Sequence, residues 1–169
     1  MNRIFLTDCH FGLARIPSCS VQLIIADPPF EDKFKWMWEC TRVIKQNGAM
    51  FILVSAGDLR EALNTISLCG LTLYECITWH WKETIHTFNH YNILYVGLQN
   101  HIKIENDVWY FERKARKNDQ GFIPMPDKLI EHMIELTTKE GDIVLDVFGG
   151  IASPVAERMG RSYWGFKLG

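Results

Sequence analysis

The chain has 169 residues, of which 47% are hydrophobic and 22% charged, so it can bury a core and is not a disordered or low-complexity chain. Its formal net charge of -2 provides no general attraction for polyanions, so a nucleic-acid site must be a local patch. No apolar run reaches the roughly 18 to 20 residues that cross a bilayer, and the N-terminus lacks the apolar centre of a signal peptide. We expect a single domain over residues 1–169, located in the cytoplasm, with no membrane partner.

Apolar patterns in the first half of the chain predict strands that alternate with helices. Residues 21–26 form a short β-branched run that ends at Asp27-Pro28-Pro29, through which no strand can continue. Helical spacing predicts helices over residues 31–45, stopped by Asn47-Gly48, and over residues 59–68. Further strands are predicted over residues 49–54, 71–79 and 92–98.

The second half begins with a segment that lacks periodicity, residues 99–121, which we interpret as a short basic excursion on the surface. Helices are then predicted over residues 126–138 and from the turn at 148–150 to residue 159, and strands over residues 142–146 and 162–166. This alternation predicts an α/β fold with a mainly parallel sheet and helices on both faces. Ligands of such folds bind where the strands deliver their carboxyl ends.

The corner at Asp27-Pro28-Pro29-Phe30 follows a predicted buried strand. Two prolines remove two N–H donors and leave carbonyl oxygens beside a carboxylate and an aromatic ring. Such a corner can accept hydrogen bonds from an exocyclic amino group and stack a planar ring. The alternative interpretation is a proline-stiffened turn with a solvated aspartate and a core phenylalanine.

Several segments together resemble the amino-methylating DNA methyltransferases of the β arrangement, in which the catalytic motif precedes the cofactor loop. The matching segments are Leu6-Thr7-Asp8-Cys9 and residues 20–30, 42–52, 90–94, 106–109 and 124–166. The resemblance implies a Rossmann-like fold that depends on S-adenosylmethionine. It also implies double-stranded DNA as the partner and no metal.

The resemblance implies a catalytic motif and a reaction. A methyl group is expected to pass to an exocyclic amino nitrogen of a flipped base, with adenine N6 favoured over cytosine N4. Phe30 is expected to stack on the base, while Asp27 and the Pro28 carbonyl accept its amino hydrogens. The expected catalytic residues are Asp27, Pro28, Pro29 and Phe30.

The resemblance also implies cofactor-binding positions, which are Asp8, Cys9, Asp146, Phe148, Gly149, Gly150, Ala152 and Lys167. Three positions depart from the family pattern. Ala152 stands where a second glycine is usual, Met125 replaces a lysine before Pro126, and Lys167 stands where an acid usually binds the ribose. The added methyl group of Ala152 is expected to crowd the cofactor.

Two groups of residues are predicted to contact DNA: Trp79 and Trp81 in the groove that admits the base, and the basic run Arg113, Lys114, Arg116 and Lys117. The alternative for the basic run is a solvated loop over buried aromatic residues. Because this segment is shorter than the family's recognition region, we expect a homodimer or a second subunit on DNA.

The sequence is also compatible with other functions. One is a catalytically silent relative that binds DNA or a partner subunit, and another is methylation of RNA or of a protein amide. A metal site at His80, His86 and His90 is a weaker hypothesis, because the spacing of the three histidines is wide. The five cysteines form no CxxC pair, which favours neither a disulfide framework nor a zinc site, and no catalytic role is assigned to them.

Overall fold

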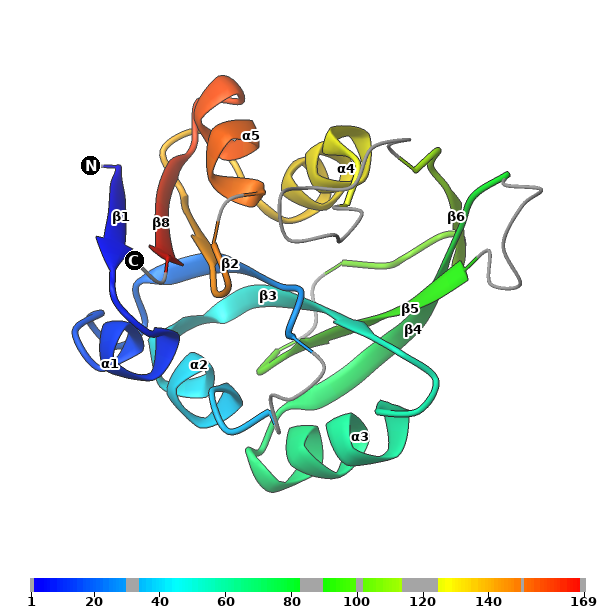
Figure 1. Cartoon of the computed structure of the whole chain (residues 1–169), viewed down its shortest axis with the longest axis horizontal. Helices are drawn as coiled ribbons and strands as arrows, with labels where there is room; N and C mark the ends of the chain where they lie inside the picture. The colour runs from blue at the N-terminus through cyan, green and yellow to red at the C-terminus, as the bar shows by residue number, and fades with distance from the viewer. Residues whose placement is uncertain are drawn as a thin grey trace.

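The computed structural model describes residues 2–29, 34–82, 90–99, 102–113, 125–149 and 151–167. These residues form one eight-stranded sheet in the order β1-β8-β7-β2-β3-β5-β4-β6 (Figure 1). The strands are β1 (Arg3–Leu6), β2 (Val21–Ala26), β3 (Ile44–Val54), β4 (Thr72–His80), β5 (His90–Gly97), β6 (Val108–Tyr110), β7 (Ile143–Asp146) and β8 (Ser162–Lys167). The helices are α1 (Cys9–Leu13), α2 (Met37–Val43), α3 (Leu59–Leu68), α4 (Asp127–Thr137) and α5 (Ala152–Arg158).

The strands share one direction except for β5. The pairs β1–β8, β8–β7, β7–β2, β2–β3 and β4–β6 are parallel, whereas β5 runs antiparallel to both β3 and β4. The prediction of a mainly parallel sheet is therefore confirmed. It follows that the carboxyl ends of β1, β8, β7, β2, β3, β4 and β6 lie along one edge of the sheet, which we call the carboxyl edge.

Helices cover both faces of the sheet (Figure 1). One apolar cluster joins α1, α2 and α3 to one face, and a second cluster joins α4 and α5 to the other. All six residues of β2 are buried, with Leu23 and Ile25 in the second cluster and Ile24 and Ala26 in the first. Burial on both faces explains why this strand is continuously apolar instead of alternating. Among the described residues, no helix is both long and apolar enough to span a bilayer.

Some element boundaries differ from the predicted ones. Strand β3 begins at Ile44, five residues earlier than predicted, because Ile44 already pairs with Val21 across a register irregularity. The Asn47-Gly48 pair, which was predicted to end a helix, therefore lies inside this strand. Helix α2 begins at Met37, and β1 and α1 were not predicted.

The excursion predicted over residues 99–121 contains a strand, β6. It pairs in parallel with β4, with Trp79 opposite Trp109. Three residues are too few to show alternation in the sequence, and the strand is formed by its pairing with β4 and by burial of Trp109.

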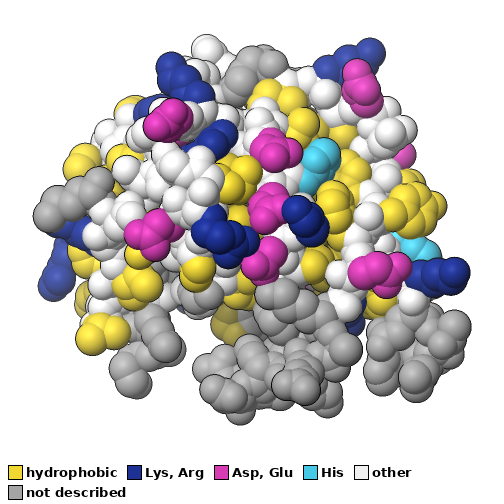
Figure 2. Space-filling view, turned by 90° about the horizontal axis from the view of Figure 1, so that it is seen from above, with side chains coloured by type: hydrophobic (Ala, Val, Ile, Leu, Met, Phe, Trp, Pro, Cys, Tyr) yellow, Lys and Arg dark blue, Asp and Glu magenta, His cyan; other side chains and the backbone are white. Residues whose placement is uncertain are grey.

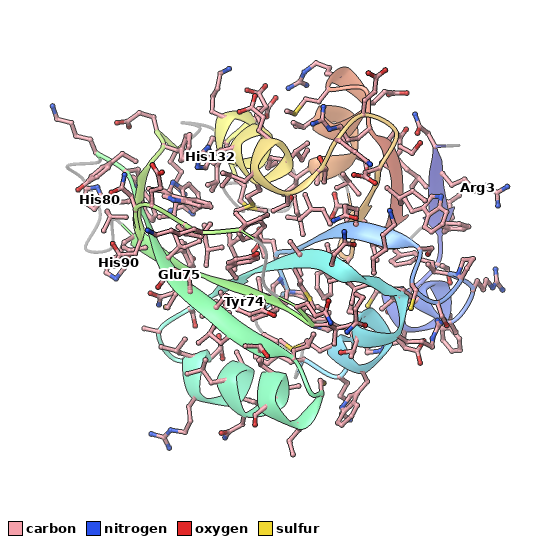
Figure 3. The ribbon with its side chains drawn as sticks, turned by 180° about the vertical axis from the view of Figure 1, so that it is seen from behind. Arg3, Tyr74, Glu75, His80, His90 and His132 are labelled. Atoms are coloured by element: carbon pink, nitrogen blue, oxygen red, sulfur yellow. The ribbon has the colours of Figure 1, made fainter. Side chains whose placement is uncertain are left out.

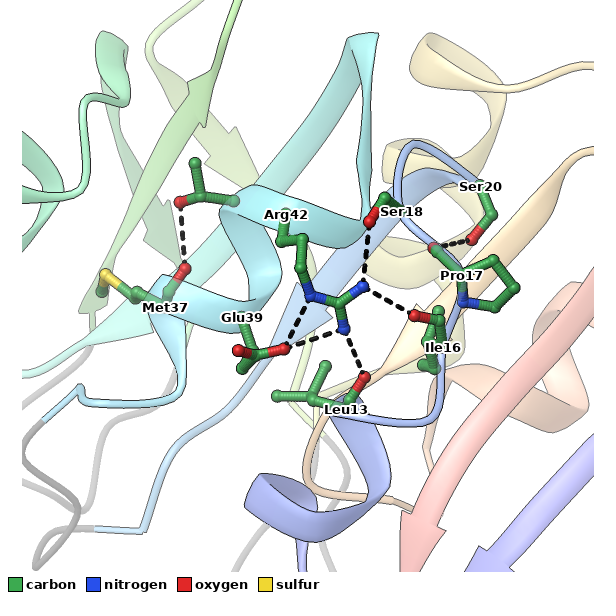
Figure 4. A network of polar contacts seen from close by, with 9 residues as sticks. Leu13, Ile16, Pro17, Ser18, Ser20, Met37, Glu39 and Arg42 are labelled. Carbon is green, nitrogen blue, oxygen red and sulfur yellow. Dashed lines mark hydrogen bonds and ion pairs between the residues drawn. The ribbon is translucent and has the colours of Figure 1, made fainter.

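Arg42 fixes the chain that leads into β2 (Figure 4). Its guanidinium donates to the carbonyl oxygens of Leu13 and Ile16, each at 2.9 Å, and to Oγ of Ser18 at 3.1 Å. It also pairs with Glu39 of the same helix at 2.8 Å. This one side chain therefore connects α2 to the end of α1 and to the loop before β2.

Candidate active site

The carboxyl edge brings together residues from both ends of the chain. Strands β1, β8, β7 and β2 are consecutive in the sheet, so Asp8, which follows β1, lies at the same edge as Asp146 and Asp27. Ile25 is the register partner of Asp146, and Asp27 follows two residues later. The structure therefore places the predicted catalytic corner beside the predicted glycine turn.

Asp146 holds the turn between β7 and α5. Its side chain is buried, and its carboxylate accepts hydrogen bonds from the backbone N–H groups of Gly149 at 2.9 Å, Ile151 at 3.1 Å and Ala152 at 2.9 Å. Burial raises the pKa of this carboxyl, and the backbone N–H bonds oppose that shift. Gly149 has a φ of 76°, a conformation that favours glycine. The carboxylate is thus engaged in shaping the turn.

Asp27 is in a different state. Asp27 is exposed as a whole residue, and its carboxyl has no hydrogen-bond partner among the described residues. Desolvation by the surrounding protein raises its pKa to about 6, the negative charge of Asp146 adds to the rise, and the positive charge of Arg113 opposes it. The residue as a whole is exposed, whereas protein atoms surround its carboxyl closely enough to desolvate it. Asp27 is therefore an available acceptor, mostly ionised at neutral pH.

The predicted cofactor residues surround the same turn. The Phe148 ring is half-buried and meets the edge of Trp36 at a centroid distance of 5.5 Å. Asp8 is half-buried and caps α1 by accepting the backbone N–H of His10 at 2.9 Å, and the next residue, Cys9, is buried. The neighbour of Phe148, Trp36, was not among the predicted site residues.

Two of the three departures from the family pattern lie in the core. Ala152 is 1% exposed and Met125 is 2% exposed, and both belong to the apolar cluster under α4 and α5. The expectation that the Ala152 methyl group crowds the cofactor is therefore not supported, because this methyl group packs inside the protein. Phe30, Gly150, Lys114, Arg116 and Lys117, and the side chain of Lys167, lie outside the described residues.

The structure changes the interpretation of the aromatic and basic groups predicted to contact DNA. Trp79 and Trp81 are each 1% exposed, so their rings form part of the core and present no surface to DNA. Arg113 is the member of the basic run that the structure describes, and its guanidinium carbon lies 4.6 Å from the ring centroid of Trp81. It is therefore seated on an aromatic ring and does not project from a solvated loop.

The histidines show no complete metal cluster within the described residues. His80, the last residue of β4, and His90, the first residue of β5, are register partners, and His132 lies on α4 (Figure 3). His86 lies outside the described residues, so the three-histidine hypothesis stays a prediction. The potential ligand atoms of Asp8, Cys9 and His10 do lie within 4.8 Å of one another, which follows from their adjacency at the start of α1.

Charges on the described surface are mixed. On the face shown in Figure 2, acidic and basic side chains are interspersed and form no broad patch of one sign. Helices α4 and α5 carry ion pairs of this kind, Lys128 with Glu131 at 2.8 Å and Arg158 with Asp127 at 3.1 Å. A nucleic-acid site on this face would therefore not depend on a general positive field, as the net charge of -2 predicts.

Comparison with characterised proteins gives relatives over the whole chain. The Type II methyltransferase M.BamHI of Bacillus amyloliquefaciens is 26% identical over 232 aligned positions, which cover 100% of this chain and 55% of that protein. The DNA adenine methyltransferase YhdJ of Escherichia coli (strain K12) is 27% identical, covering 95% of this chain and 76% of that protein. The chain thus spans about half the length of M.BamHI.

Solved structures share the fold. The PvuII DNA methyltransferase, which is cytosine-N4-specific, superimposes with a TM-score of 0.84 at 17% identity, covering 99% of this chain and 82% of that chain. The M1.HpyAVI–SAM complex superimposes with a TM-score of 0.76 at 20% identity, covering 100% of this chain and 94% of that chain. These likenesses confirm the expected Rossmann-like methyltransferase fold.

A sequence model of a protein family, described as DNA methylase, matches residues 71–169 of this chain. This stretch contains β4 to β8 and the turn held by Asp146. This match covers more than half of the chain. The protein therefore belongs to the DNA methylase family that this model, N6_N4_Mtase, defines.

Proposed function

We propose that this protein transfers a methyl group from S-adenosylmethionine to an exocyclic amino group of a base in double-stranded DNA. The observation that carries the proposal is Asp27, an exposed residue whose carboxyl has no partner among the described residues, beside the turn held by Asp146. Membership of the DNA methylase family supports the same reaction. We take adenine N6 as the expected acceptor, since an aspartate heads the motif, and relatives named for each base make cytosine N4 the alternative.

The described residues fit S-adenosylmethionine. Gly149, with its φ of 76°, lets the backbone of the turn approach a ligand closely. The half-buried Phe148 ring offers an apolar surface, and the half-buried Asp8 carboxyl can accept hydrogen bonds from amino or hydroxyl groups. We assign cofactor binding to Asp8, Cys9, Phe148 and Gly149, with Asp146 as the residue that shapes the turn. When bound, the cofactor supplies an electrophilic methyl group.

The role of Asp27 follows from its ionisation. As a carboxylate it accepts a hydrogen bond from the amino group of the target base, and the Pro28 carbonyl is available for the second hydrogen. These bonds orient the nitrogen lone pair, so positioning supplies much of the rate. The amino nitrogen must lose a proton as it gains the methyl group, and a carboxylate with a pKa of about 6 can accept that proton at neutral pH.

The target base must leave the duplex to reach this carboxylate. The alignment with M.BamHI extends over 232 positions, more than the 169 residues of this chain, so the relative carries additional residues between the matched segments. We therefore propose that a second copy or a second subunit contributes to DNA recognition. A monomer by light scattering on a duplex that the protein methylates would contradict this.

Calorimetry tests the proposed function. The folded protein is titrated with S-adenosylmethionine, with and without a mixed-sequence duplex, and methylated nucleosides are then identified by mass spectrometry. We expect micromolar binding and an N6-methyladenine product, and N4-methylcytosine would change only the base. No heat at millimolar cofactor, with DNA present and the protein verifiably folded, would instead indicate a silent relative that binds DNA or a partner.

A further inference from the structure

Arg113 is held on two aromatic rings at the carboxyl edge. It follows β6 by three residues, and its guanidinium carbon lies 4.6 Å from the Trp81 ring centroid and 5.6 Å from that of Tyr91. The two rings are nearly parallel, at an interplanar angle of 27°. Stacking of this kind fixes the plane of a guanidinium and favours its positive charge.

The backbone before Arg113 is also fixed. The Phe111 N–H donates to the carbonyl of His80 at 3.2 Å, and Nε1 of Trp79 donates to the carbonyl of Phe111 at 2.9 Å. These bonds tie the exit of β6 to the end of β4. The position of Arg113 is therefore set by the sheet and not by a free loop.

One donor of this cation lacks a partner within the described part of the chain. Nε of Arg113 is buried and has no hydrogen-bond partner among the described residues. Leaving a buried donor unpaired is costly, so such groups in native proteins usually have a partner or serve a ligand. Since Nε is covered and the residue as a whole is only half-buried, the other guanidinium N–H groups of Arg113 are the donors to which a ligand could bind.

Arg113 also influences Asp27 electrostatically. The two side chains form no ion pair within the described residues, yet the charge of Arg113 lowers the pKa of Asp27. The geometry agrees with this effect, because Tyr91 under Arg113 precedes Asn92, which pairs with Val54 of β3, and β3 also pairs with β2 just before Asp27. The ring under Arg113 and the Asp27 corner are therefore two strands apart at the carboxyl edge. Asp146 adds a second negative charge there, which disfavours a phosphate group and leaves a neutral acceptor as the better ligand for Arg113.

We propose that Arg113 binds the target base itself, by donating a hydrogen bond to the ring nitrogen beside the amino-bearing carbon while Asp27 accepts the amino hydrogen. This inference rests on the proposed methyl transfer and names a further substrate-binding residue for it. Adenine N1 and cytosine N3 are both such acceptors, so the pair Asp27 and Arg113 suits either base. The corresponding ring position in thymine carries a hydrogen, which would face the donor and be rejected.

The variants Arg113→Ala and Arg113→Lys test this role, with Arg60→Ala on the exposed part of α3 as the matched control. Each is assayed for transfer to a methylatable duplex, for its pH–rate profile, and for binding to that duplex and to one lacking the target base. Unfolding midpoints and cofactor affinity show that each variant is folded and loaded. Wild-type transfer on the same duplex establishes the proposed function separately.

We expect Arg113→Ala to lower kcat/KM by about 10- to 100-fold, the effect of a hydrogen bond to a charged donor, with Arg60→Ala unchanged. The acid limb of the pH–rate profile should move to higher pH, because Asp27 loses a positive neighbour, and Arg113→Lys should restore the limb but not the full rate. Binding to the abasic duplex should match that of the wild type. The inference would be overturned if Arg113→Ala kept the wild-type kcat/KM. It would also be overturned if Arg113→Ala bound both duplexes more weakly by the same factor and with a changed salt dependence, since that result identifies a phosphate contact.

Discussion

The ends of β2 and β7 carry the same side chain one strand apart, and the two aspartates are in opposite states. Asp146 is buried and accepts three backbone N–H bonds, whereas Asp27 is exposed and accepts none among the described residues. A carboxylate whose acceptors are filled by the chain organises structure, and one whose acceptors are open can serve a ligand. Hydrogen-bond occupancy, and not residue type or place in the fold, separates the two roles.

Asp27→Asn should give the largest effect. The amide is nearly isosteric but cannot accept a proton, so we expect methyl transfer to fall by about 100-fold or more. Steady-state kinetics measure this. Asp107→Asn, at an exposed aspartate before β6, is the matched control and should keep the wild-type rate. A comparable loss in the control would remove the distinction between Asp27 and any other surface carboxylate.

Asp146→Ala should instead act on stability. Removing the carboxylate leaves the N–H groups of Gly149, Ile151 and Ala152 without their acceptor, so we expect the free energy of unfolding to fall by about 3 kcal/mol. Urea denaturation measures the loss, and Asp146→Asn, which keeps one oxygen, should lose less. Equal stability of Asp146→Ala and wild type would show that water replaces the carboxylate at no cost.

The pH dependence sharpens the contrast, because the Asp27 pKa rises from 3.8 to about 6 in the folded protein. Folding thus favours protonated Asp27, so its contribution to stability is present below pH 3.8 and is lost as the pH rises through about 6. Relative to Asp27→Asn, the wild type should therefore lose unfolding free energy across this window. The rate should show the reverse trend and decrease below about pH 6. A rate independent of pH between 5 and 8 would argue against ionised Asp27 in the reaction.

The smallest effect is expected away from the carboxyl edge. Arg42→Lys keeps the charge but loses bonds to Leu13, Ile16 and Ser18, so the free energy of unfolding should fall by about 1 kcal/mol. Transfer per folded molecule should not change, because these contacts lie before β2 and not at its carboxyl end. A selective loss of activity would mean that the entry of β2 also positions Asp27.

Local sequence predicted much of this site. The apolar run before Asp27 and the glycine turn after Asp146 each lie within a few residues, so periodicity and turn chemistry locate both strand ends. The different states of the two aspartates were not predictable in this way. They depend on which backbone N–H groups face each carboxyl after α5 docks on the sheet.

Long-range packing accounts for the rest. Arg113 meets Trp81 and Tyr91 because β6 pairs with β4 and β4 pairs with β5, contacts between segments far apart in the sequence. The charged segment around Arg113 has no regular apolar pattern, so the sequence does not predict that this side chain packs on aromatic rings. The burial of Ala152 was likewise set by how α5 packs, although its place in the family motif had indicated contact with the cofactor.

A single-turnover experiment separates binding from chemistry at Asp27 most directly. Wild type and Asp27→Asn are loaded with labelled S-adenosylmethionine and a duplex that the wild type methylates, and transfer is followed in a single turnover. We expect both proteins to bind the cofactor with similar affinity and only the wild type to transfer the label at a measurable rate. Transfer by Asp27→Asn at the wild-type rate would contradict the claim that the open carboxylate at the end of β2 carries the reaction.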